Sequence, residues 1–200
     1  MGEFMNSLEL NEIINYIEDK EIDIKDNWFL HGTSNNIEIV EKILKEGIKC
    51  TYLRKEKGDQ GHNGKYYISV SKFSTDEDSA YKLFEHCPTF VLDKISPIHA
   101  KTDKERYYYA SNFMNTIIPF RCSAYEDEYH SFLKINPSKI VALAYSLNLQ
   151  LSDYKLNIKR LEFLKEMILC IDKMNLDLPI YDFSSKKEVN KEKVRSLKLS

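Results

Sequence analysis

The chain has 200 residues, of which 42% are hydrophobic and 30% charged, so it is long enough to bury the core of one globular domain. Its formal net charge of −2 excludes a global basic surface for nucleic acid or an anionic membrane, and any basic patch would have to be local. The sequence has no run of about 18 apolar residues and no secretory leader pattern. We expect a single domain over residues 5–183, after a remnant of an expression vector at residues 1–4 and before a polar, basic tail at residues 184–200.

The cysteine and glycine patterns argue against a cysteine-based framework and against a glycine-rich phosphate loop. The cysteines Cys50, Cys87, Cys122 and Cys170 lie far apart without a CxxC pair, so neither a zinc site nor a disulfide framework is predicted, and we expect reduced thiols. The sequence contains neither GxGxxG nor GxxxxGK[ST]. A nucleotide would therefore have to be held without a glycine-rich phosphate loop.

The first two elements are predicted from apolar spacing. Behind a possible cap at Ser7, apolar residues recur at helical intervals, which predicts an amphipathic helix from residue 7 to about 20. The apolar run 28–30 then stops at small polar residues, which is typical of a buried strand that ends at a loop. His31 is therefore expected at a strand end.

A helix with both ends marked follows this strand. Asn35 or Asn36 can cap its start, and Gly47 can supply the left-handed residue at its end. The residues expected to face the core are Ile37, Val40, Ile43 and Leu44. Together these residues predict a strand, turn, helix and glycine unit.

The remaining elements are predicted with the same two periodicities. Residues 51–65 carry three of the six glycines and few apolar side chains, which indicates a mobile loop. We expect strands at 65–71, 89–92, 128–135 and 140–145, helices at 75–85 and 153–174, a turn at 136–138, and a solvated tail after Pro179. No assignment is made between about 100 and 120.

Polar side chains gather at the ends of three of these predicted strands. His31 is followed by Thr33, Tyr67 is followed by Ser69, and Glu128 is preceded by Glu126. Strand ends and the adjoining loops are where a scaffold commonly presents binding and catalytic groups. Taken singly, such residues are more often structural or solvated, and their joint order along the chain makes them candidates.

The three groups resemble the motifs of the ADP-ribosyltransferase superfamily, in its His-Tyr-Glu branch of diphtheria-toxin-like and poly(ADP-ribose) polymerase-like enzymes. The matching segments are Leu30-His31-Gly32-Thr33, the helix end Glu46-Gly47-Ile48, Gly64-Lys65-Tyr66-Tyr67-Ile68-Ser69 with Ala80-Tyr81, and the strand that begins Glu128-Tyr129. The resemblance spans residues 28 to 145. Two features depart from the pattern: Glu126-Asp127-Glu128 also resembles the arginine-modifying branch, and the interval from Tyr67 to Tyr81 is long.

This resemblance implies an α+β fold, an ADP-ribosyltransferase-like split β-sandwich with an N-terminal helix and a long C-terminal helix. It also implies roles. His31 would bind a ribose hydroxyl, and the backbone at Gly32 would bind the nicotinamide carboxamide. Tyr67 and Tyr81 would sandwich the nicotinamide ring. Glu128 would stabilise the oxocarbenium-like transition state. Thr33 and Ser69 would support the ribose, and Glu126 would contact the acceptor.

The implied activity is mono-ADP-ribosyl transfer. The enzyme would cleave NAD as a substrate, need no metal, and modify an acceptor macromolecule that we expect to be a protein, with nucleic acid left open. The absence of a leader or membrane span indicates a cytoplasmic protein, or a bacterial effector or toxin delivered to a host cytosol.

Four alternatives stay open. An NAD glycohydrolase would use the same pocket with water as acceptor. An RNA 2′-phosphotransferase would need additional basic residues around His31, and no matching set is visible in the sequence. A degenerate transferase fold could serve as an interaction module. A cysteine protease would pair Cys87 or Cys122 with a histidine such as His130, although neither cysteine lies in a recognisable nucleophile motif.

Overall fold

The structure is a computed structural model of the whole chain. It describes residues 12–13, 15–54, 67–73, 87–99, 128–147, 154–183 and 185–198, with the side chains at 98, 99, 128, 154, 155 and 157 left outside the description. The predicted helix at 75–85 and the unassigned stretch from 100 to 120 lie outside these residues.

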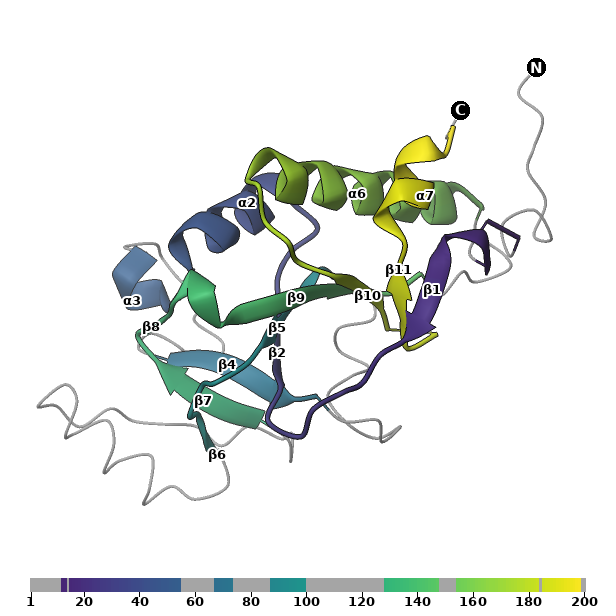
Figure 1. Cartoon of the computed structure of the whole chain (residues 1–200). Coiled ribbons are helices and arrows are strands. Elements are labelled where there is room, and N and C mark those ends of the chain that lie inside the picture. The colour runs from purple at the N-terminus through teal and green to yellow at the C-terminus, as the bar shows by residue number, and fades with distance from the viewer. Residues whose placement is uncertain are drawn as a thin grey trace, which may run out of the picture.

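A large, mostly antiparallel sheet forms the centre of the molecule (Figure 1). Its spatial order is β1-β11-β10-β9-β5-β2-β4-β7-β6, and only β9 and β10 are described as a parallel pair. The strands are β1 (Glu18–Glu21), β2 (Phe29–Gly32), β4 (Tyr67–Lys72), β5 (Thr89–Leu92), β6 (Ile98–His99), β7 (Glu128–Phe132), β9 (Ile140–Tyr145), β10 (Ile180–Asp182) and β11 (Lys187–Val189). A small second sheet pairs β3 (Ile48–Lys49) with β8 (Lys134–Ile135).

Helices α2 (Ile37–Glu46) and α6 (Tyr154–Lys173) lie together over one face of the large sheet (Figure 1). The shorter helical elements are α3 (Thr51–Arg54), η2 (Pro137–Lys139) and α7 (Lys191–Ser196). The main core lies between α2, α6 and the sheet, and includes the fully buried Val40, Phe90, Leu143, Leu164 and Ile168. Burying apolar side chains from both layers is what holds a helix on a sheet face.

The predicted start, buried face and end of α2 are confirmed, whereas the conformation predicted at its last position is not. The Asn36 side chain accepts hydrogen bonds from the backbone N–H groups of Glu38 and Ile39, and Val40 and Leu44 face the core. Gly47 ends the helix with φ of 83°, and its N–H donates to the carbonyl of Ile43 at 2.8 Å. Its ψ of 174° is extended, however, so Gly47 is not the ordinary left-handed cap.

One predicted helix end and one predicted tail near the chain ends are wrong. The described helical residues of the N-terminal segment stop at 17, and Glu18 begins β1, so the helix does not continue to about residue 20. The segment after Pro179, predicted as a solvated tail, forms β10, β11 and α7 instead. Val194 of α7 is fully buried, and the Arg195 guanidinium donates two hydrogen bonds to Asp172 of α6, at 2.7 and 2.9 Å. The polar end of the chain is thereby fixed to α6.

Two predictions in the middle of the chain also need correction. The strand predicted over 128–135 is broken at Leu133, whose φ of 59° bends the chain out of the large sheet and into the pairing of β8 with β3. Part of the predicted loop 51–65 is the helix α3, because the carbonyl of Cys50 accepts hydrogen bonds from the N–H groups of Leu53 and Arg54. Residues 55–65 of that loop lie outside the description.

The expected α+β class is confirmed at the level of a mixed fold with a large, mostly antiparallel sheet and a few helices. The strands at 89–92 and 140–145 and the long helix near 153–174 appear at the expected places, as β5, β9 and α6. Over the described residues, no helix combines the length and the apolar character that crossing a membrane requires.

Candidate functional site

The three strands that carry His31, Tyr67 and Glu128 are neighbours in the large sheet. β2 pairs with β4, and β4 pairs with β7, both antiparallel. The register is Leu30 with Ser71, Ser71 with Glu128, and Tyr67 with Phe132. Segments separated by more than 30 residues in the sequence are thus side by side in the sheet.

The same register spreads the three residues along their strands. Tyr67 begins β4, whereas Glu128 begins β7 and pairs with Ser71, four residues further along β4. At about 3.3 Å per residue, this places the Tyr67 and Glu128 backbones roughly 13 Å apart along the strands. The Glu128 side chain, Tyr81 and Glu126 are all outside the description, so their roles stay predictions.

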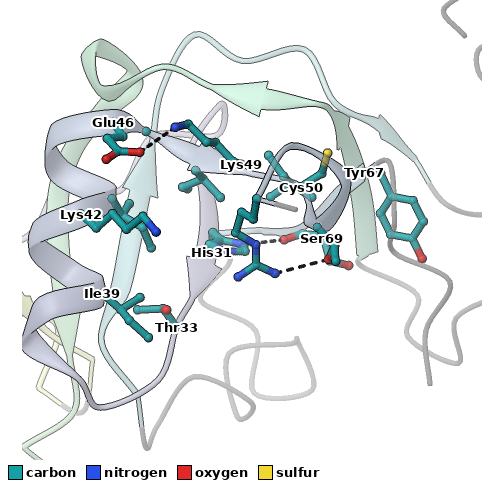
Figure 2. A pocket seen from close by; sticks show the side chains of 15 residues that line it. His31, Thr33, Ile39, Lys42, Glu46, Lys49, Cys50, Tyr67 and Ser69 are labelled. Carbon is teal, nitrogen blue, oxygen red and sulfur yellow. Dashed lines mark hydrogen bonds and ion pairs between the residues drawn. The ribbon is translucent and has the colours of Figure 1, made fainter. Parts of the chain in front are cut away.

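A pocket of about 220 Å³ lies where β2 and β4 meet α2, β3 and α3 (Figure 2). Four of the predicted site residues line it: His31 and Thr33 from the end of β2, and Tyr67 and Ser69 from β4. The pocket is smaller than the roughly 300–1,000 Å³ of whole small-molecule sites. It therefore fits part of a nucleotide rather than an entire dinucleotide.

His31 has a defined hydrogen-bonding state in this pocket. Its Nδ1 lies 2.8 Å from the backbone carbonyl oxygen of Ser69, as Figure 2 shows. Because a carbonyl oxygen only accepts, Nδ1 carries the proton, and in the neutral ring Nε2 is left as an acceptor. Burial lowers the pKa of His31 below its ordinary value, and the nearby Arg54 adds to this, while the bond to Ser69 acts in the opposite direction. The ring is therefore neutral at pH 7 and can accept from a ligand hydroxyl.

We expect the His31 side chain to titrate with a midpoint below the ordinary value of about 6.5. The unfolded chain then binds a proton at higher pH than the folded one, so the contribution of His31 to stability is complete above about 6.5 and is lost as the pH falls below it. Two-dimensional NMR of the histidine side chains, with His31→Gln to assign the signal, measures the midpoint. A midpoint at or above 6.5 would contradict the lowering of the His31 pKa by burial.

The Tyr67 ring has one face already covered. It stacks on His130 of β7 with ring centroids 3.8 Å apart and an angle of 24° between the planes. Both side chains are buried, and Figure 2 shows Tyr67 at the rim of the pocket, beyond Ser69. A bound nicotinamide could use only the opposite face or the edge of Tyr67.

Gly32 and Thr33 are held by the neighbouring strand. Gly32 pairs with Thr89 of β5, and the Thr33 N–H donates to the carbonyl of Pro88 at 2.9 Å. The backbone of this loop is thus fixed by β5, which positions the Thr33 side chain at the pocket wall. The Thr33 N–H itself is occupied and does not bind a ligand.

Sequence reasoning missed the charged side of the pocket. Lys42 and Glu46 line it from α2, Lys49 from β3, and Thr51 and Arg54 from α3. Their sequence signal was a concentration of Lys and Arg between residues 42 and 57, within a chain of net charge −2. This concentration of basic residues is visible in the sequence, but the sequence does not show that it lies beside His31.

The cysteines give no support to a protease. Burial raises the pKa of the Cys87 thiol, and the hydrogen bonds around it only partly offset this effect. An activated nucleophile needs a lowered thiol pKa. Cys50 and Cys170 are buried free thiols, and Cys122 lies outside the description. Over the described residues, no group of three His, Cys, Asp or Glu side chains is arranged to hold a metal.

Comparison with known proteins gives no match to a family model, a curated protein or a solved structure.

Proposed function

We propose that this chain is a mono-ADP-ribosyltransferase that cleaves NAD and transfers ADP-ribose to an acceptor, expected to be a protein. One observation carries the proposal. His31, Thr33, Tyr67 and Ser69, which sequence motifs had grouped, line one pocket from the adjacent strands β2 and β4. The next strand, β7, begins at Glu128, whose backbone pairs with Ser71, four residues along β4 from Tyr67.

The proposed roles follow from the chemistry of these groups. Neutral His31 accepts a hydrogen bond from a ribose hydroxyl through Nε2. Tyr67, supported from behind by His130, offers its remaining ring surface to the nicotinamide. Glu128 provides a negative charge for the oxocarbenium-like ribose that forms as the C–N bond to nicotinamide breaks. Nicotinamide leaves with the bonding electrons, and the acceptor nucleophile then forms the new bond to the ribose.

A second candidate gains support from the charged wall of the pocket. An RNA 2′-phosphotransferase requires basic residues near the histidine, and Lys42, Lys49 and Arg54 line the same pocket as His31. Incubation with NAD and a 2′-phosphorylated RNA oligonucleotide tests this candidate. Loss of the 2′-phosphate from the RNA would favour it over transfer to protein.

The proposed function is tested with NAD carrying one label on nicotinamide and a second on the adenylate. Purified protein is incubated with this NAD in the presence and absence of cell lysate. We expect release of nicotinamide and attachment of the adenylate label to a protease-sensitive lysate component.

Two other results of this experiment would each favour a different function. Nicotinamide release without attachment of the adenylate label would indicate an NAD glycohydrolase. No release, together with no NAD binding by calorimetry, would indicate an interaction module built on a transferase-like scaffold. A protein of that kind would retain the pocket without turnover.

A further inference from the structure

The pocket beside His31 carries more positive than negative charge. Among the described residues, three cations line it, Lys42 from α2, Lys49 from β3 and Arg54 from α3, against the single carboxylate of Glu46. Glu46 is already engaged, since it accepts a hydrogen bond from Lys49 at 2.6 Å. The local charge is thus opposite in sign to the net charge of −2 of the whole chain.

We propose that Lys42 and Arg54 form a phosphate subsite that holds the diphosphate of a nucleotide ligand. Lys42 extends from α2 into the pocket, opposite His31 (Figure 2). Arg54 lies close enough to His31 to influence it electrostatically. A planar guanidinium binds two phosphate oxygens at once, and an ammonium group adds a point charge.

The other groups in the pocket favour a phosphate over an isolated carboxylate. Thr33 and Thr51 line the pocket with hydroxyls, which can donate to the several oxygens of a phosphate. Arg54 donates to the Thr51 hydroxyl at 3.3 Å, which links the guanidinium to the same wall. The volume of about 220 Å³ fits a diphosphate and an attached sugar.

Lys45 shows what a lysine of α2 does outside the pocket. It forms an ion pair with Glu41 at 2.5 Å, one turn earlier on the same helix, and Lys173 of α6 approaches the same carboxylate. Lys42, by contrast, has no ion-pair partner within 4 Å among the described residues. Lys45 is therefore a matched control. It is also an exposed lysine of α2, but it pairs with a carboxylate outside the pocket.

The subsite deepens the proposed function and rests on it for the identity of the ligand as a nucleotide. Its test uses ADP, inorganic pyrophosphate and adenosine, each measured by calorimetry on the full chain at low ionic strength. The variants are Lys42→Gln and Arg54→Gln, with Lys45→Gln as the control. We expect wild type to bind ADP and pyrophosphate more tightly than adenosine, and each pocket variant to bind ADP about tenfold more weakly, as loss of one charged hydrogen bond predicts.

The binding results for the phosphate subsite can be distinguished from the results for NAD cleavage. Unchanged ADP affinity in both pocket variants, or equal affinity for ADP and adenosine, would overturn the subsite, as would the absence of ADP binding to wild type. A loss of affinity in Lys45→Gln equal to that in Lys42→Gln would also overturn it, because the effect would then be one of general charge. ADP binding that depends on Lys42 and Arg54, in a protein that releases no nicotinamide, would support the subsite and refute the transferase.

Discussion

Glu128→Gln is expected to lower the rate of nicotinamide release from NAD by about 10² to 10³ while leaving the fold and the affinity for NAD unchanged. Glutamine has nearly the same shape as glutamate and can still form hydrogen bonds, but it carries no charge. The substitution therefore removes stabilisation of the transition state, in which the ribose becomes positive, and leaves the binding of the ground state unchanged. Steady-state release of labelled nicotinamide gives the rate, and calorimetry gives the affinity.

Two further variants make the Glu128 experiment selective. Glu162→Gln removes an exposed carboxylate from α6, remote from β7 in the sequence, and should leave turnover unchanged. Glu128→Asp keeps the charge but withdraws it by one methylene, so its rate should lie between those of wild type and Glu128→Gln. Near-normal turnover in Glu128→Gln would remove this residue from the mechanism, even if NAD cleavage itself were established.

The predictions that succeeded depended on neighbouring residues. The Asn36 cap, the buried stripe of α2 and the position of β4 are each set within about ten residues of sequence. Periodicity and capping patterns predict such segments well, because the interactions that stabilise them are local. The four predicted residues that line the pocket from β2 and β4 came instead from short motifs that resemble those of a known family.

The predictions that failed depended on distant pairing. β1 is a strand because it pairs with β11, about 170 residues later, and its sequence, Glu18–Glu21, has no β-branched or aromatic residue. β11 has two charged residues before the buried Val189 and is held between β1 and β10. Tertiary pairing here overrides intrinsic strand preference, which is weak and depends on context. No local pattern could show that the polar end of the chain completes a sheet.

The charged wall of the pocket was missed for a related reason. Lys42, Lys49 and Arg54 come from a helix, a strand and a second helix, so they share no single periodicity. Helix α3 itself was predicted as loop, which removed any reason to place Arg54 near His31. Side chains that converge only through the packing of three elements are visible once the fold is known.

The end of α2 at Gly47 was predicted correctly, but the ordinary left-handed conformation expected there was not. Its φ of 83° and ψ of 174° lie in a region of backbone space that is essentially restricted to glycine. A Cβ at this position would lie 2.2 Å from the carbonyl oxygen of Ile135 and 3.0 Å from Cδ of Pro137. The absence of a side chain therefore allows β8 and η2 to approach the end of α2, at the wall of the pocket.

Gly47→Ala is expected to destabilise the protein by on the order of 3 kcal/mol, since backbone strain and overpacking each cost about 1–3 kcal/mol. Gly47→Asn should cost about as much. Asparagine tolerates the ordinary left-handed cap, but the extended ψ and the contact with the Ile135 carbonyl remove that advantage. Urea unfolding followed by circular dichroism measures both variants, with Lys45→Ala on the exposed face of α2 as a control expected to lie within about 0.5 kcal/mol of wild type. Stability of Gly47→Asn close to wild type would mean that the position is an ordinary helix cap, and that the close approach of β8 does not constrain it.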